Sequence, residues 1–78
     1  MFPATMGIQK IALNVDDMSD SERQQLIDHP ATHAEVKRYA QLKQAAIKLR
    51  LAGRIMEAKR LEDKCDGVYD VIPKKLRW

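Results

Sequence analysis

Residues 32–72, THAEVKRYAQLKQAAIKLRLAGRIMEAKRLEDKCDGVYDVI, decide the fold of this chain. Apolar side chains recur every three or four positions on both sides of Ala52–Gly53, which is the spacing of amphipathic helices. Glycine costs about 1 kcal/mol inside a helix and is favoured just after a helix ends, so Gly53 marks a turn. A short turn between two amphipathic helices makes them antiparallel neighbours. We therefore predict helices over 33–52 and 54–72 that form an antiparallel hairpin.

The two predicted helices differ in their apolar faces. At 100° per residue the first helix has one stripe made of Tyr39, Leu42, Ala46 and Leu49. Its second stripe is made of Val36, Ala40, Ile47 and Leu51. The second helix has a single stripe, made of Ile55, Ala58, Leu61, Cys65, Val68, Tyr69 and Ile72. A helix with two apolar stripes usually has two contacts, so we expect the first stripe to meet the following helix and the second to meet the N-terminal segment or another chain.

Capping residues predict where the helices begin and end. Ser19 with Glu22 forms a capping box, which predicts a short helix over 20–28 that ends before His29-Pro30. Thr32 with Glu35 forms a second capping box at the start of the hairpin. Pro73 stops the last helix and leaves 73–78 as a basic tail, whereas Gly67 weakens that helix near its end.

The first 15 residues read as an N-terminal arm. Ile11, Leu13 and Val15 alternate with Ala12 and Asn14, so 8–15 fits a short strand, and a two-turn helix is the competing interpretation. A lone strand leaves its backbone groups unpaired, so a strand here would need a partner strand. The predicted fold is thus mainly α, an antiparallel hairpin with a short preceding helix and an extended arm or short strand.

A chain of 78 residues forms a single domain, 1–78, and buries too little surface to be very stable alone. Small domains usually gain stability from disulfides, a metal or a partner chain. The single cysteine, Cys65, excludes an internal disulfide and fits a reducing compartment. This points to self-association or to binding on a larger protein.

Charge is unevenly distributed along the chain. Residues 1–30 have two Lys/Arg against five Asp/Glu, a net −3, and residues 31–78 have twelve against six, a net +6. Such asymmetry can steer an acidic partner to one side, or the acidic part can fold back onto the basic part. The N-terminus lacks the features of a signal peptide, and no apolar stretch approaches the roughly 20 residues that span a bilayer. We therefore expect a cytoplasmic protein without a membrane partner.

Part of the hairpin resembles a known repeat. Over residues 42–65, the spacing of small and apolar residues resembles a single tetratricopeptide-type helical hairpin, carried by Leu42, Ala45, Ala46, Leu49, Gly53, Ile55 and Ala58. Glu62 departs from that pattern, and solenoid repeats need about three units to be stable. The resemblance implies protein binding. The chain also resembles small phage- or mobile-element-encoded proteins in size and style, which would place it in the cytoplasm of a bacterial host.

No catalytic, metal or cofactor site emerges from the candidate groups. His29 and His33 are four apart, but Pro30 breaks the helix that would align them, and only Cys65 offers a third zinc ligand. Cys65 lies on an apolar stripe and is expected in the core. Asp16, Asp17, Asp20 and Glu22 suit the start of a helix and lack the spacing of a calcium loop. We therefore predict a protein that is not an enzyme.

Basic residues are the best candidates for contact with a partner. Lys43 and Arg50 lie between the two stripes of the first helix, where a charge must extend to solvent, pair with an acid or face a partner. Trp78 either covers the open end of the hairpin, against Val68 or Ile72, or anchors an interface. The residues predicted to bind a partner are Lys43, Arg50, Arg54, Lys74, Arg77 and Trp78.

Taken together, these features predict a protein–protein interaction module, a small inhibitor or adaptor that occupies a surface of a larger protein or nucleoprotein assembly. Self-association into a homo-oligomer is expected through the second stripe. A small basic nucleic-acid-binding protein is the first alternative, although such proteins usually carry a stronger positive charge than +3. A self-assembling structural component is the second alternative.

Overall fold

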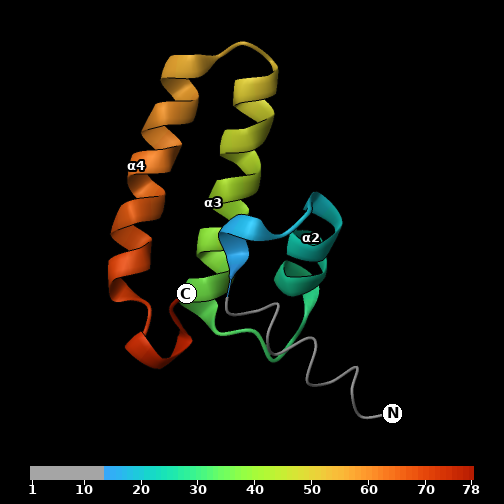
Figure 1. Ribbon diagram of the computed structural model, residues 1–78, viewed down its shortest axis with the longest axis vertical. Helices are drawn as coiled ribbons and strands as arrows, with labels where there is room; N and C mark the ends of the chain where they lie inside the picture. Colours follow the sequence, from blue (N-terminus) through green and yellow to red (C-terminus); the bar gives the residue numbers. More distant parts are fainter. Residues whose placement is uncertain (1–13) are drawn as a thin grey trace.

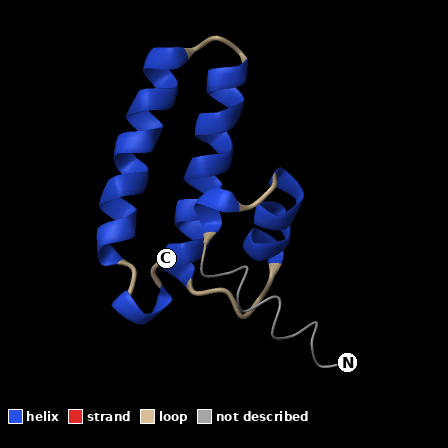
Figure 2. Ribbon diagram, viewed as in Figure 1, coloured by secondary structure: helices blue, strands red, loops and turns tan. Residues whose placement is uncertain are grey.

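The computed structural model describes residues 14–78, which form three α-helices and two short 3-10 helices (Figures 1 and 2). In chain order they are η1 (Val15–Asp17), α2 (Asp20–Asp28), α3 (Ala34–Leu51), α4 (Ile55–Val71) and η2 (Lys74–Leu76). Helices α3 and α4 pack side by side as an antiparallel hairpin, and α2 lies beside the lower half of α3 (Figure 1). The mainly α fold and the preceding short helix are confirmed. The predicted strand or helix over 8–15 lies outside the described residues except at its end, where Val15 opens η1.

The turn of the hairpin has the predicted geometry. Gly53 has a φ of 82°, a left-handed conformation that costs other residues energy. Gly53 N–H donates to Arg50 O at 3.1 Å and Arg54 N–H to Leu49 O at 2.9 Å, so carbonyls at the end of α3 remain bonded. Both long helices begin and end within one residue of their predicted bounds, and α4 continues through Gly67 to Val71.

The start of α3 differs from the prediction. His33, not Thr32, is the N-cap, and its Nδ1 accepts a hydrogen bond from Glu35 N–H at 3.2 Å. The Thr32 hydroxyl instead donates to Leu26 O, near the end of α2, at 2.6 Å. The second capping box was therefore wrong, because a carbonyl at the end of α2 takes the hydroxyl that the box requires. The first box is confirmed: Ser19 accepts from Glu22 N–H, and Glu22 accepts from Ser19 N–H.

The core lies at the lower end of the hairpin, where η1, α2, α3, α4 and η2 meet. Its buried side chains are Val15, Met18, Leu26, Val36, Tyr39, Ala40, Cys65 and Ile72. Both stripes of α3 contribute, since Tyr39 faces Tyr69 of α4 and Val36 and Ala40 share the core with Leu26 of α2. The N-terminal segment thus covers the start of the second stripe, which was predicted to meet either this segment or another chain. Leu76 and Trp78 pack against the same core, so 73–78 is a folded element as well as a basic tail.

Arg23 is a buried cation that fastens η1 and α2 to α3. Only 4% of it is exposed, and its guanidinium donates to the backbone carbonyls of Val15 and Met18. Its Nε donates to Gln44 Oε1 at 2.9 Å, and its Nη2 lies 2.8 Å from Asp20 Oδ1. Arginine suits this position because its planar group presents several donors at once.

Candidate interaction surface

Two of the predicted contact residues, Lys43 and Arg50, lie in ion pairs within the chain. Lys43 Nζ lies 3.6 Å from Asp16 Oδ1, so the acidic N-terminal part does fold back onto the basic part. Arg50 binds both carboxylate oxygens of Glu62 on α4, at 2.7 and 2.8 Å from its Nη2. Each charge that lies between the apolar stripes of α3 therefore has an acidic partner.

The remaining predicted residues fall at opposite ends of the hairpin. Arg54 pairs with Glu57 at 2.6 Å beside the turn. Arg77 donates to the carbonyls of Ile72 and Asp70 and lies over the ring of Tyr69, 5.3 Å from its centroid. Lys74 is exposed on η2. The structure does not bring the six predicted residues into one patch.

Trp78 belongs to an aromatic cluster that covers the lower end of the hairpin. Its ring packs edge to face on Tyr39 and Tyr69, with centroids 4.9 and 5.0 Å away. Its indole Nε1 donates to Asp16 Oδ2 at 2.9 Å, and Tyr39 Oη donates to Asp16 Oδ1 at 2.6 Å. Of the two predicted roles, the described chain shows Trp78 covering the open end of the hairpin.

Asp16 is the shared acceptor of this cluster. Its partial burial acts to raise its pKa, but the hydrogen bonds from Tyr39 and Trp78 and the nearby Lys43 outweigh that effect, so its pKa is lowered. Burial and the contact with Asp16 raise the pKa of Tyr39, which stays a neutral donor. The cluster is a set of satisfied structural contacts, and no buried side-chain polar atom in residues 14–78 lacks a partner.

Cys65 and the two histidines have structural surroundings. Cys65 is buried as predicted, and burial raises the pKa of its thiol to about 11, so the reactive thiolate is scarce. His29 Nδ1 accepts from Ala31 N–H in the turn after α2, and His33 Nδ1 accepts from Glu35 N–H at the start of α3, so each histidine side chain has a local backbone partner. Residues 14–78 contain no group of three or more side chains placed to hold a metal ion.

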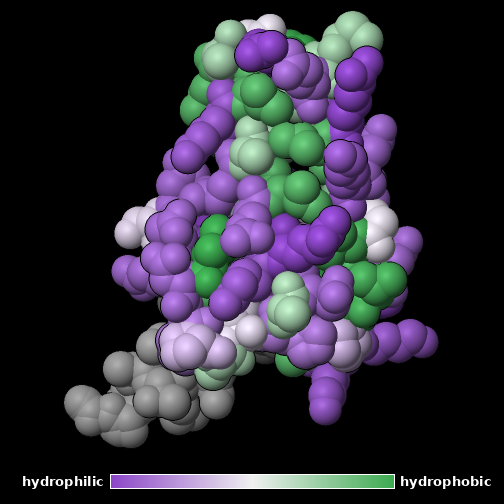
Figure 3. Space-filling model, turned by 180° about the vertical axis from the view of Figure 1, so that it is seen from behind, coloured by the Kyte–Doolittle hydropathy of each residue, from purple (hydrophilic) through white to green (hydrophobic). Residues whose placement is uncertain are grey.

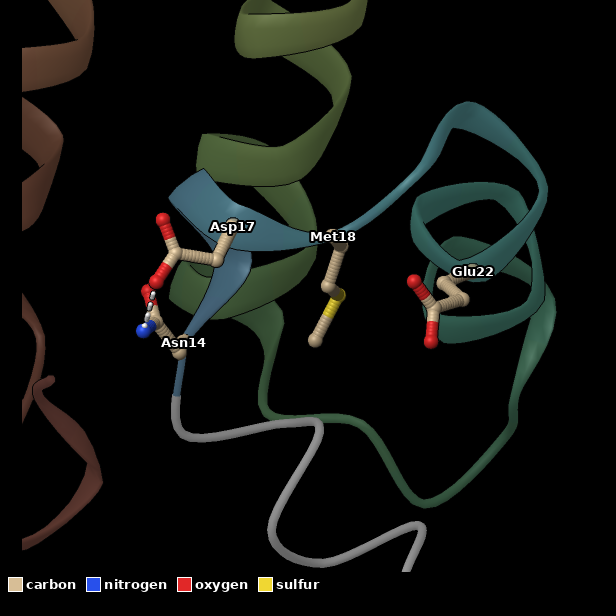
Figure 4. Close-up of a pocket in the computed structure, with 4 residues that line it drawn as sticks. All are labelled: Asn14, Asp17, Met18 and Glu22. Atoms are coloured by element: carbon tan, nitrogen blue, oxygen red, sulfur yellow. Dashed lines mark hydrogen bonds between the residues drawn. The ribbon is translucent and has the colours of Figure 1, made fainter.

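A shallow hollow lies where η1 meets the start of α2, lined by Asn14, Asp17, Met18 and Glu22 (Figure 4). Its two carboxylates have local partners, since Asn14 Nδ2 donates to Asp17 Oδ2 at 2.6 Å and Glu22 accepts in the capping box. Figure 4 shows Asp17 and Glu22 on opposite sides of the hollow, with Met18 between them. The hollow offers neither a paired carboxylate for acid–base chemistry nor a free cation for an anionic substrate.

The far end of the hairpin exposes most of the large apolar side chains that the described chain leaves in solvent. Leu51 is 82% exposed, Met56 73% and Ile55 39%, and all three flank the turn. Because α2 has only nine residues, it covers Val36 and Ala40 but not the continuation of the second stripe at Leu51. We call Leu51, Ile55 and Met56 the tip surface. In the view from behind, apolar side chains are exposed along the upper half of the hairpin, between hydrophilic ones (Figure 3).

The solvent face of α3 has a different chemistry. Its residues recur on one side of the helix, opposite the sides that meet α2 and α4, and they are Ala34, Lys37, Arg38, Gln41, Ala45, Lys48 and the adjoining Ala52. We call this set the α3 basic face; it holds no acidic residue and no large apolar one. Lys37, Arg38 and Lys48 form no ion pair with any of residues 14–78. Helical periodicity separates Lys37, Arg38 and Lys48 on this face from Lys43 and Arg50 between the stripes, and of these five only Lys43 and Arg50 were predicted to bind a partner.

Comparisons of the chain with models of protein families, with curated proteins and with solved structures found no match. Within the described part, no helix is both long enough and apolar enough to cross a membrane.

Proposed function

We propose that this protein is a non-enzymatic protein-interaction module, a small inhibitor or adaptor that binds a larger protein assembly through the tip surface. The observation that carries the proposal is the exposure of Leu51 and Met56 at 82% and 73%. Clustered apolar side chains in water are unfavourable, and they commonly mark a surface that a partner covers. We also propose that the protein acts in the cytoplasm. If a phage encodes the protein, this is the cytoplasm of the bacterial host.

Charge around the tip supports an acidic partner rather than a second copy of the tip. Residues 47–62, which include the ion pairs Arg50–Glu62 and Arg54–Glu57, contain five basic residues and two acidic residues, a net charge of 5 − 2 = +3. The basic ones are Lys48, Arg50, Arg54, Lys59 and Arg60, against Glu57 and Glu62. Two such ends placed together would repel each other. A partner surface that is acidic and has an apolar depression would complement both the basic residues and the exposed apolar side chains of the tip.

Site-specific photo-crosslinking in the native host tests the proposal. A photoreactive residue at Met56 should yield a crosslinked partner, and the same residue at Val71 should not. Val71 is the matched control because it is 61% exposed and apolar but lies at the other end of α4. The Leu51→Ser/Met56→Ser variant should keep its helical circular dichroism and lose the partner.

Two results would contradict this proposal. Crosslinking at Val71 to the same partner as at Met56 would mean that the tip is not the contact. A dimer in analytical ultracentrifugation that the Leu51→Ser/Met56→Ser variant abolishes would assign the tip to self-association instead.

A further inference from the structure

We propose that the α3 basic face binds the phosphate backbone of double-stranded DNA. This activity goes beyond the protein interaction at the tip and does not use Leu51, Ile55 or Met56; among its cations, only Lys48 also contributes to the charge around the tip. The outward faces of the two long helices differ in charge. The α3 basic face has no acidic residue. The outward side of α4 carries both signs, with Lys59, Arg60 and Lys64 alongside Asp63, Asp66 and Asp70.

The charge of the α3 basic face is not balanced by the fold. Arg38 and Lys48 are exposed and Lys37 is half-buried, and none of them pairs with a described acid. Asp20 of α2 lies next to α3, where its backbone carbonyl accepts a hydrogen bond from Gln44. Its carboxylate is 2.8 Å from the buried Arg23 and is therefore compensated. An uncompensated basic stripe along one helix is the electrostatic pattern of a nucleic-acid contact.

The shape of the face fits a duplex groove. Tyr39 packs on Tyr69 of α4, and Val36 and Ala40 belong to the core shared with α2, so the basic face forms the outer ridge of α3. Lys37 and Lys48 lie about 16 Å apart along the axis, at 1.5 Å per residue. Ala45 keeps the side chain short between Arg38 and Lys48, and Ala34 and Ala52 do so at the two ends of the face. A major groove about 12 Å wide admits a helix of this kind, and Gln41 lies at its centre as a hydrogen-bonding side chain.

Fluorescence anisotropy with a labelled 20-base-pair DNA duplex tests this inference across a salt series. Three phosphate contacts predict a slope of about −2.7 in a plot of log affinity against log salt, or about a 40-fold loss between 50 and 200 mM salt. The Arg38→Ala/Lys48→Ala variant should bind more weakly, with a slope near −1. The Arg60→Ala/Lys64→Ala variant has the same loss of charge and should keep the slope of the parent protein.

Circular dichroism of both variants checks that they fold, which is expected because all four side chains are exposed. A loss of slope in the α3 variant alone would support the proposal. An unchanged anisotropy at low salt would overturn it, as would equal losses in the two variants, which indicate a response to net charge. Equal affinity for poly-L-glutamate of matched charge would also overturn it and assign the face to acidic protein surfaces.

Discussion

The indole nitrogen of Trp78 donates a hydrogen bond to the carboxylate of Asp16 at 2.9 Å, and this contact joins residues 62 positions apart. The other carboxylate oxygen accepts from Tyr39 on α3, and Lys43 lies 3.6 Å from it. One exposed carboxylate therefore links η1, the first long helix and the C-terminal segment. The short helices on either side of the hairpin are held in place by the same group.

Acid should weaken this linkage. The pKa of Asp16 is lowered in the folded protein, so its contribution to stability is present above the unfolded pKa and is lost as pH falls through the folded value. The free energy of unfolding, followed in urea by the fluorescence of the single tryptophan, should decrease as the pH falls below about 5 and through the ordinary aspartate pKa of 3.8. Asp16→Ala should cost about 1–2 kcal/mol at pH 7 and flatten that part of the profile.

Asp17→Ala is the matched control for this experiment, because Asp17 is the neighbouring carboxylate and hydrogen-bonds Asn14. It should leave the pH profile of the parent protein nearly intact. A parent-like acid transition in Asp16→Ala would show that another carboxylate carries the effect.

Arg23 should be the most sensitive basic residue for stability. Arg23→Ala would remove the donors to Val15 O, Met18 O and Gln44 Oε1 and should lower the free energy of unfolding by about 2–4 kcal/mol. Arg23→Lys should recover only part of this, since an ammonium cannot donate in the same planar arrangement. Urea titrations compare these variants with Arg38→Ala, an exposed site where the change should stay within about 0.5 kcal/mol. Equal effects at Arg23 and Arg38 would contradict a structural role for Arg23.

Local patterns in the sequence predict the helices well, because their causes are local. The spacing of apolar residues, Gly53 and the Ser19–Glu22 box each act over a few residues, and each has the predicted structure. The Thr32 cap failed since the competing acceptor, Leu26 O, belongs to the preceding helix. The Thr32 hydroxyl can either cap α3 or bond a carbonyl of the preceding helix, and the spacing of apolar residues does not distinguish these two hydrogen bonds.

The candidate surface was less predictable because it depends on which acid reaches which base. Arg50 and Glu62 lie on different helices, and Asp16 meets Lys43 only after η1 folds onto α3. Helical periodicity places Lys43 and Arg50 between the two stripes, where a charge must extend to solvent, pair with an acid or face a partner, and tertiary packing decides among these outcomes. Exposure of Leu51 likewise depends on the length of α2, which ends before it could cover the whole stripe.

Cys65 should be protected from thiol reagents in the folded protein. Burial raises its pKa to about 11, and only 3% of the residue is exposed. Reaction with a disulfide reagent at pH 8 should be slow in buffer and fast in urea, with a rate set by unfolding. Rapid stoichiometric labelling of the native protein would contradict its place in the core.

Alanine at the two described glycines should have opposite effects. A Cβ added at either position would meet no atom within 4 Å, so the backbone conformation decides the outcome. Gly53 has a φ of 82°, and Gly53→Ala should lower the free energy of unfolding by about 1 kcal/mol. Gly67 lies within α4, where Gly67→Ala should raise it by about 0.5–1 kcal/mol. Thermal melts of the two variants should therefore shift in opposite directions, and a shift in the same direction would contradict the left-handed turn at Gly53.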